Sequence, residues 1–335
     1  MKNDKIWGLL LHMTNSYATR RTKSPTLLFD DDVWNYTIEN AAKAGFNTIV
    51  LETIDGVMYT SHPEISVSDA WTPSKLKKEI KKCNDLGLTV IPKCNFSAPH
   101  SGWLGQYRRL TSTAEYYHVC NDIICELYEL FNHPEYIHIG MDEEDEEHAK
   151  FIGDGFGFFR RGELFWHDYR FLLECVKKTG AKPWVWYDAS NGHDPQKCDD
   201  TEFKKRIDLD EVMISPWYYH FFDEKKFMRI EDYKYDLTPY RGMDIKYVEE
   251  FPKLRVVRET AYSKLEEGYH YIPTSWSYVK ENIHDLMEFF AKGPQENMHG
   301  HLVSVWCQLD WKNKDRLDNA FTEFKMAKDK FYPND

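Results

Sequence analysis

Short apolar runs that alternate with amphipathic helical segments constrain the fold of this chain more than any other feature. The runs are rich in β-branched and large apolar residues, as expected for strands that are buried on both faces. We expect eight such strands, at 6–12, 48–52, 88–92, 136–139, 183–188, 212–217, 269–273 and 302–306. A chain in which strands and helices alternate folds as an α/β protein with a parallel sheet.

Capping residues mark the ends of the expected helices. Asp30 opens a helix that Gly45 ends, and Pro73 stands at the first position of the next helix, which Gly87 stops. A long helix is expected at about 113–131. Each helix therefore begins soon after one strand and ends just before the next.

This order predicts a single (β/α)8 barrel that spans residues 1–335 as one domain, with an irregular insertion around 218–258. A doubly wound open sheet is the alternative. It normally carries Gly-x-Gly-x-x-Gly after its first strand, and this chain does not. Gly153, Gly155 and Gly157 follow the fourth strand and have a different spacing.

Composition excludes several partners. The net charge is −12 without a dense block of lysine or arginine, so nucleic acid is not expected. No apolar run approaches the ~20 residues of a membrane span. Seven cysteines without metal-ligand spacing suggest reduced thiols and a cytoplasmic protein, although removal of a signal peptide would leave the same pattern. No cofactor is expected, and the oligomeric state stays open.

The carboxyl ends of barrel strands share one face, where the chemistry of such folds is found. Asp142 and Glu143 come directly after the fourth strand, at the start of a run of six acids that ends at Glu147. Such a run also fits the solvated first turn of a helix. Its position at the end of a buried strand favours a site at the mouth of the barrel.

The other strand ends add aromatic, amide, imidazole and carboxylate side chains. Carboxylic acids transfer protons, and aromatic faces stack on the apolar faces of sugar rings, so the mixture predicts a carbohydrate site. The candidate substrate-binding residues are Glu52, Asn95, His100, Trp186, Asp188, Trp217, Tyr218, Trp276, Tyr278, Trp306 and Gln308.

Several of these residues have a structural alternative. Glu52 fits a paired acid inside the barrel as well as it fits a ligand-binding residue, and His12 fits a core histidine. Trp184 is expected to pack outward, between barrel and helix, with Trp186 facing inward. His138 lies within its strand and is expected to pack. No metal is expected, because His-Glu-x-x-His is absent from the sequence.

Two motifs resemble glycoside hydrolase family 20, the β-N-acetylhexosaminidases. The segment 138–143, His-Ile-Gly-Met-Asp-Glu, is similar to that family's His-x-Gly-Gly-Asp-Glu. The segment 90–101 is similar to its Ile-Pro-Glu-x-Asp-x-Pro-Gly-His run. Asn47, Trp186 and Trp306 fall in matching order, so the resemblance covers most of the barrel.

The resemblance implies that Glu143 protonates the leaving oxygen, while Asp142 orients and stabilises the substrate's own 2-acetamido group. That group acts as nucleophile in a substrate-assisted, retaining mechanism. An adjacent carboxylate and aromatic burial are expected to raise the pKa of Glu143. The implied substrate is an oligosaccharide or glycoconjugate that carries a β-linked 2-acetamido sugar.

The chain departs from the family pattern where that pattern holds sugar hydroxyls. Lys93 and Asn95 replace acids, Pro99 replaces glycine, and Gln308 stands where an acid is expected. The first strand also lacks the family's Asp and Arg pair. Two alternatives therefore stay open: a barrel glycosidase that acts on a neutral sugar, and a non-catalytic carbohydrate-binding pseudo-enzyme.

Overall fold

The computed structural model describes residues 5–14, 26–27, 29–145, 148–149, 158–188, 200–219, 262, 264–279 and 281–335. Within them one parallel sheet has the strand order β7-β6-β5-β4-β3-β2-β1-β9-β8. The strands are β1 (Ile6–His12), β2 (Thr48–Glu52), β3 (Thr89–Lys93), β4 (Tyr136–His138), β5 (Lys182–Trp186), β6 (Met213–Ser215), β7 (His270–Tyr271), β8 (Thr274–Trp276) and β9 (Gly300–Ser304). Most of the insertion expected around 218–258 lies outside the described residues.

The sheet closes into a barrel through its seventh strand, which is divided into β7 and β8. On one side of the division, Ile272 N donates to Ile214 O at 2.9 Å and Thr274 N donates to Pro216 O at 2.9 Å. On the other side, Leu302 N donates to Pro273 O at 3.0 Å, and β8 pairs with β9. The expected (β/α)8 fold is therefore confirmed, with the seventh strand extending to Trp276 and interrupted at its proline.

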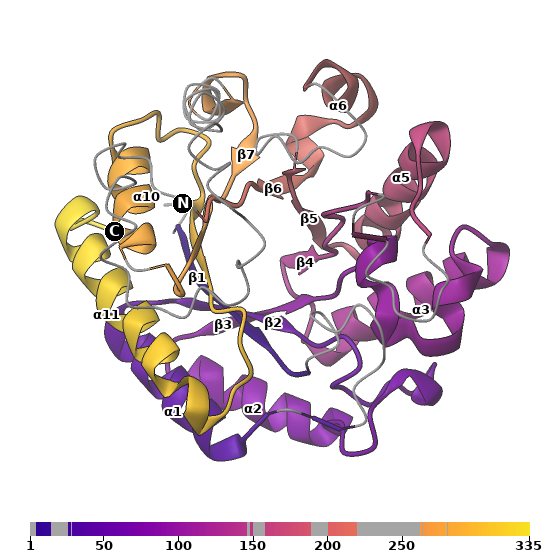
Figure 1. Ribbon diagram of the computed structural model, residues 1–335, viewed down its shortest axis with the longest axis horizontal. Coiled ribbons are helices and arrows are strands. Elements are labelled where there is room, and N and C mark those ends of the chain that lie inside the picture. Colours follow the sequence, from indigo (N-terminus) through magenta and orange to yellow (C-terminus); the bar gives the residue numbers. More distant parts are fainter. Residues whose placement is uncertain are drawn as a thin grey trace, which may run out of the picture.

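Helices surround the strands (Figure 1). They are α1 (Asp31–Ala44), α2 (Pro73–Asp85), α3 (Ala114–Leu130), α5 (Gly162–Thr179), α6 (Asp200–Arg206), α10 (Asn282–Ala291) and α11 (Lys314–Phe331). The 3-10 segments are η1 (Pro63–Ile65), η4 (Leu209–Glu211), η7 (Trp311–Asn313) and the longer η2 (Ala98–Leu110), which is kinked at Gly105. Among the described helices, none is both long and apolar enough to cross a membrane.

The expected caps are present. The Asp30 side chain accepts from Asp32 N at the start of α1, and Gly45 ends that helix with a left-handed φ of 92°. The Thr72 side chain accepts from Lys75 N at the start of α2. These caps satisfy backbone groups that have no partner inside the helix, so each helix stops where the chain must return to the barrel.

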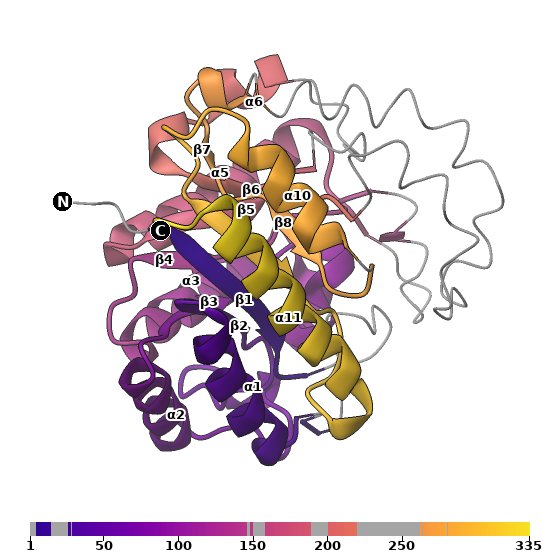
Figure 2. The ribbon, with the colours of Figure 1, turned by 90° about the vertical axis from the view of Figure 1, so that its left-hand side faces the viewer.

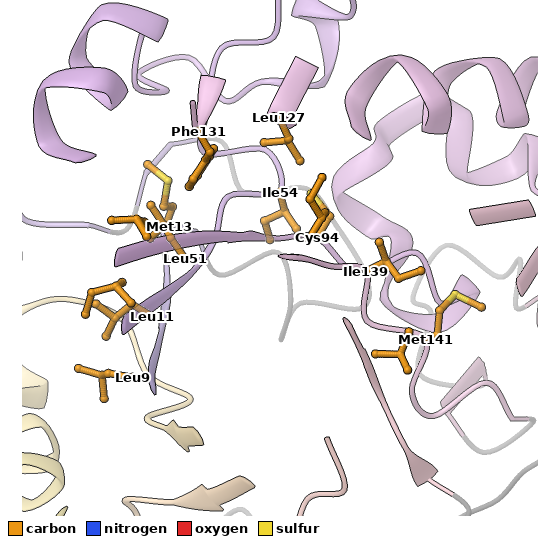
Figure 3. Packing of buried hydrophobic residues seen from close by; sticks show 14 of the residues in the cluster. Leu9, Leu11, Met13, Leu51, Ile54, Cys94, Leu127, Phe131, Ile139 and Met141 are labelled. Atoms are coloured by element: carbon orange, nitrogen blue, oxygen red, sulfur yellow. The ribbon is translucent and has the colours of Figure 1, made fainter. Parts of the chain in front are cut away.

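Two apolar cores lie on the two faces of the sheet. Leu9, Leu11 and Leu51 belong to the outer core, between the strands and the helices, and so do Leu127 and Phe131 (Figure 3). Farther out, α11 lies across the outside of β1 (Figure 2), with the rings of Trp7 and Phe324 6.1 Å apart. Leu10, Val50, Ile91, Met213 and Leu302 fill the inside of the barrel. Successive strand residues thus alternate between the cores.

Trp184 lies inside the barrel, so its expected outward position was wrong. It is fully buried with Trp186 in the inner core, and its Nε1 donates to Ser215 Oγ at 2.7 Å. Residues two apart on a strand face the same side, so Trp184 shares the face of Trp186 and the residue between them, Val185, faces the helices.

Candidate active site

The turn after β4 presents Asp142 and Glu143 at the mouth of the barrel. Its backbone is left-handed at Gly140, Met141 and Glu143, with φ values of 74°, 77° and 51°. A Cβ at Gly140 would lie 2.2 Å from Asn95 Oδ1, so only glycine fits there. Non-glycine residues hold such φ values where the surroundings impose them, and they concentrate at functional sites.

Asn95 fixes the position of Asp142. Its Nδ2 donates to Asp142 Oδ1 at 2.7 Å, and its Oδ1 accepts from the backbone N–H groups of Met141 and Ser97 at 3.2 and 3.1 Å. Both side chains are buried. The Asn95 amide donates a hydrogen bond here, where a second carboxylate would repel Asp142.

Glu143 lies between two histidines. Its Oε2 is 3.0 Å from His100 Nε2, and its Oε1 is 3.2 Å from His148 Nε2. Its backbone N–H donates to Asp188 Oδ2 at 2.6 Å. The side chain is 20% exposed, so its carboxyl group is partly open to solvent from the mouth.

The expectation that the pKa of Glu143 is raised was wrong. Burial does oppose its ionisation, but hydrogen bonds and charges from His100 and His148 outweigh burial and hold the pKa well below its usual range. Asp188 shows the opposite shift: burial, and then the charge of Asp142, raise its pKa well above the usual range. Both Asp188 oxygens accept hydrogen bonds, Oδ2 from Glu143 N and Oδ1 from Trp217 Nε1 at 2.8 Å.

Half-buried aromatic rings form a row beside the acids. Trp306 Nε1 donates to the Tyr219 hydroxyl at 2.8 Å, and the Tyr219 ring lies 5.2 Å from Trp217 and 5.4 Å from Trp276. Trp276 in turn stacks on Tyr278, with 4.9 Å between centroids. The structure therefore brings together the tryptophans expected from strands six to eight and adds Tyr219 to them.

Strand alternation separates the two neighbouring tyrosines. Tyr218, expected at the site, is buried in the outer core, and its hydroxyl bonds that of Tyr271 at 2.5 Å. Tyr219 takes its place at the mouth. The alternation of Trp217 inward and Tyr218 outward could have identified Tyr219 from the sequence. Gln308 is half-buried, two residues beyond Trp306.

His148 and Asp145 were also missing from the expected site. Asp145 lies in the acid run after β4 and His148 directly follows that run, where the sequence suggests only solvated charges. Glu144, the acid that directly precedes Asp145, is buried and accepts a hydrogen bond from Arg160 Nε at 2.8 Å. Asp145 and His148 stand three residues apart, a spacing that brings side chains together in a helical turn.

A buried group of charges lies inside the barrel, beside the aromatic row. Glu52, fully buried, bonds His12 Nδ1 at 2.5 Å through Oε2 and forms an ion pair with Lys93 through Oε1. Burial opposes ionisation of Glu52, but Lys93 and His12 outweigh it and lower its pKa to about 2. The structure thus places Glu52 and Lys93 in a closed ion pair. His138 is likewise buried, between Trp184 and Trp186.

Three side chains meet a simple distance condition for a metal. Among the described residues, His100, Asp142 and Glu143 each offer a ligand atom, and these atoms lie within 4.8 Å of one another. Tetrahedral zinc with bonds of about 2.0 Å would hold its ligand atoms about 3.3 Å apart. The 3.0 Å between His100 Nε2 and Glu143 Oε2 is a hydrogen-bond distance, so we assign these contacts to hydrogen bonding.

No protein-family model and no curated protein sequence matches this chain. Solved structures do match. A GH20 exo-β-N-acetylglucosaminidase from Vibrio harveyi, in complex with N-acetylglucosamine, aligns with a TM-score of 0.60 and 13% identity over 97% of this chain and 54% of that one.

Two Streptomyces structures agree with it. The GH20 β-N-acetylhexosaminidase from Streptomyces coelicolor has a TM-score of 0.59 and 12% identity over 96% of this chain and 63% of that one. The N-acetyl-β-hexosaminidase from Streptomyces plicatus has a TM-score of 0.57 and 16% identity over 96% and 64%. This chain thus spans between about half and two thirds of the three matched chains. Its fold is that of the GH20 β-N-acetylhexosaminidase structures.

Proposed function

We propose that this protein is a glycoside hydrolase of the β-N-acetylhexosaminidase type. It removes a β-linked 2-acetamido sugar from an oligosaccharide or glycoconjugate by a substrate-assisted, retaining mechanism. The observation that carries the proposal is the pair Asp142 and Glu143 at the barrel mouth, the first held by Asn95 and the second by two histidines. The fold shared with the GH20 structures supports the same proposal.

In this mechanism Asp142 works as an ionised carboxylate. With Oδ1 occupied by Asn95, its Oδ2 accepts from the N–H of the substrate's acetamido group. The acetamido oxygen then attacks the anomeric carbon, and the bond to the leaving oxygen breaks with its electron pair on that oxygen. The negative charge of Asp142 stabilises the positive charge of the oxazolinium-like intermediate.

Glu143 supplies the proton that the leaving oxygen takes up. In the second half of the reaction, the same carboxylate takes a proton from water, whose oxygen then attacks the anomeric carbon and reopens the ring of the intermediate. The half-buried ring row at the mouth provides faces on which a sugar stacks.

The two acids that could serve as a protein nucleophile are poorly placed for it. Glu52 is fully buried and paired with His12 and Lys93. Burial and the charge of Asp142 favour the protonated form of Asp188 by raising its pKa, and a protonated carboxyl is a weak nucleophile. These placements support an acetamido nucleophile over the neutral-sugar alternative.

A panel of nitrophenyl β-glycosides tests the proposal. We expect hydrolysis of the 2-acetamido sugars and not of the matching sugars with a 2-hydroxyl, together with inhibition by a thiazoline analogue of the intermediate. A 2-fluoro sugar, which traps enzymes that use a protein nucleophile, should not label the protein. Labelling of Asp188 or Glu52 would establish the neutral-sugar mechanism instead, and sugar binding without turnover would establish the pseudo-enzyme.

A further inference from the structure

Asp145, His148 and Glu143 form a continuous chain of side-chain contacts at the mouth. His148 Nδ1 lies 2.8 and 2.7 Å from the two carboxylate oxygens of Asp145, and the backbone N–H of His148 donates to Asp145 Oδ1 at 2.7 Å. The other ring nitrogen, Nε2, lies 3.2 Å from Glu143 Oε1. The imidazole is 16% exposed and held at both nitrogens.

The acceptors around His148 determine where its protons lie. An ionised carboxylate only accepts hydrogen bonds, so Asp145 requires the proton on Nδ1. Nε2 and Glu143 Oε1 then share one further proton. The pair is either a neutral imidazole that accepts from a protonated Glu143, or an imidazolium that donates to the carboxylate.

We propose that Asp145 and His148 are positioning residues that store, at His148 Nε2, the proton that Glu143 delivers to the leaving oxygen. This inference rests on the proposed function. Glu143 needs a source for that proton, because the two histidines favour its ionised form before substrate binds.

The proton moves in two balanced steps. As the bond between the anomeric carbon and the leaving oxygen breaks, the proton on His148 Nε2 passes to Glu143 and from Glu143 to that oxygen, which leaves the carboxylate ionised and His148 neutral. When water attacks the intermediate, Glu143 takes a proton from the water and passes it to His148 Nε2. Each cycle therefore leaves the pair as it began.

His100 is the second imidazole on Glu143, and its surroundings differ. Its Nε2 lies 3.0 Å from Glu143 Oε2 and 3.7 Å from Asp142 Oδ2, so two carboxylates compete for its proton. A proton on His100 also stabilises the ionised Asp142 that the mechanism needs. The contacts thus direct the His148 proton to Glu143 and divide the His100 proton between the two acids.

Two further titratable groups face the acids from other strands. Asp188, after β5, accepts from Glu143 N, and its protonated form adds no charge. The hydroxyl of Tyr219, after β6, has its pKa raised by burial and then by Asp142 and Glu143, so it is neutral in the working pH range. The proton that the pH effect concerns is therefore the one that Glu143 shares with His148 and His100.

This arrangement predicts the direction of a pH effect. An imidazolium between two carboxylates keeps its proton to higher pH than an isolated histidine, whose pKa is about 6.5. The active form has one proton on the Glu143–His148 pair, and activity falls as pH rises and removes it. Without His148, that proton is lost at lower pH.

His148→Gln tests the inference on a substrate with a poor leaving group. We expect the basic limb of the kcat/KM profile to move to lower pH by about one unit. At pH values above the limb, kcat/KM should therefore fall by about tenfold. Little loss is expected at acidic pH or with an activated aryl leaving group. Asp145→Asn should move the limb in the same direction. An unmoved limb in both variants would overturn the inference.

His133→Gln is the matched control, because His133 Nε2 lies 3.2 Å from Glu129 Oε2, the same separation, on an exposed surface. Its profile should equal that of the wild type. If instead His148→Gln and Asp145→Asn lose the same factor at every pH while His133→Gln does not, the role of His148 is structural and the inference is wrong.

Histidine ring NMR gives a readout that does not need activity. With the signal assigned by its absence in His148→Gln, His148 should titrate above 6.5 in the wild type and lower in Glu143→Gln. Titration at the ordinary value in both proteins would overturn the inference. Failure to hydrolyse any glycoside would overturn the proposed function, while the NMR titration would still decide whether the proton pair exists.

Discussion

The indole of Trp306 stacks on the imidazole of His12, with 4.7 Å between ring centroids and 22° between planes. His12 in turn bonds Glu52, which pairs with Lys93. A ring of the proposed sugar site therefore rests directly on a buried ionic group. Any change in that group alters the support of the ring as well as the stability of the barrel.

Glu52→Gln should destabilise the fold by about 3–5 kcal/mol, because it leaves Lys93 charged and buried without its partner. Urea unfolding would measure the loss. A Glu52→Gln/Lys93→Met double variant is the comparison and should recover part of it. If the single variant is as stable as the wild type, the ion pair is not needed for folding.

The same group predicts an acid limit to stability. Lys93 and His12 lower the pKa of Glu52 to about 2 in the folded protein, while in the unfolded chain the pKa of this carboxyl group is near its ordinary value of 4.5. The contribution of the ionised Glu52 to the free energy of unfolding is complete above about pH 4.5 and is lost as the pH falls towards 2. Urea unfolding between pH 5 and 2.5 should show this loss, and Glu52→Gln should lack that part of the slope.

Glu143→Gln should lower turnover of poor leaving groups by about 10²–10⁴-fold, the usual contribution of general acid catalysis. Activated aryl glycosides, which need little protonation, should be affected much less. Steady-state kinetics on both kinds of substrate would measure the difference. An equal loss on both would remove Glu143 from the role of acid.

Asp142→Asn should keep the local geometry and lower turnover by about 10²–10³-fold, by analogy with the loss of one electrostatic stabiliser of a transition state. Thiazoline affinity should fall with it, whereas product affinity should change less. Calorimetry with both ligands gives the comparison. Unchanged thiazoline binding would show that Asp142 does not hold the acetamido group.

Trp306→Ala and Trp276→Ala should weaken sugar binding more than Trp184→Ala. Trp184 is fully buried, and its removal should cost about 3–5 kcal/mol of stability. Trp311→Ala, at a 49% exposed tryptophan, is the surface control. Calorimetry and thermal melts separate the two effects, and normal sugar affinity in both mouth variants would exclude stacking.

Gly140→Ala should destabilise the protein by about 2–4 kcal/mol, since the new methyl group meets Asn95 and the backbone stays left-handed. Gly87→Ala is the matched control: its φ is +80° with no atom within 4 Å of the new Cβ, so it costs only the backbone term, about 1–2 kcal/mol. Chemical denaturation would measure both variants. Equal losses of stability in the two variants would show that the turn at Gly140 rearranges to accommodate the methyl group.

Local chemistry made most of the fold predictable. Asp30, Gly45 and Pro73 set helix ends through contacts within a few residues, so the sequence alone places them. The division of the seventh strand at Pro273 was missed because it depends on pairing with strands distant in sequence. The outward position expected for Trp184 was wrong, because residues two apart on a strand face the same side and Trp186 faces inward.

The site was less predictable than the fold. Asp142 and Glu143 stand out because they end an apolar run. The charge state of Glu143, in contrast, depends on His100, 43 residues away in sequence, and on His148, which directly follows an acid run that looks solvated. Such contacts follow from the course of the loops, which strand and helix periodicity does not encode.

The two tyrosines after β6 show how segment length selects a residue for the site. Tyr218 belongs to the core and Tyr219 holds the indole of Trp306 only because they occupy opposite parities on the extended chain. Deleting one residue between Ser215 and Tyr218 would turn Tyr218 towards the mouth and Tyr219 towards the outer core without altering either side chain. At this edge of the barrel, a change of segment length would therefore change which side chain faces the mouth without any substitution.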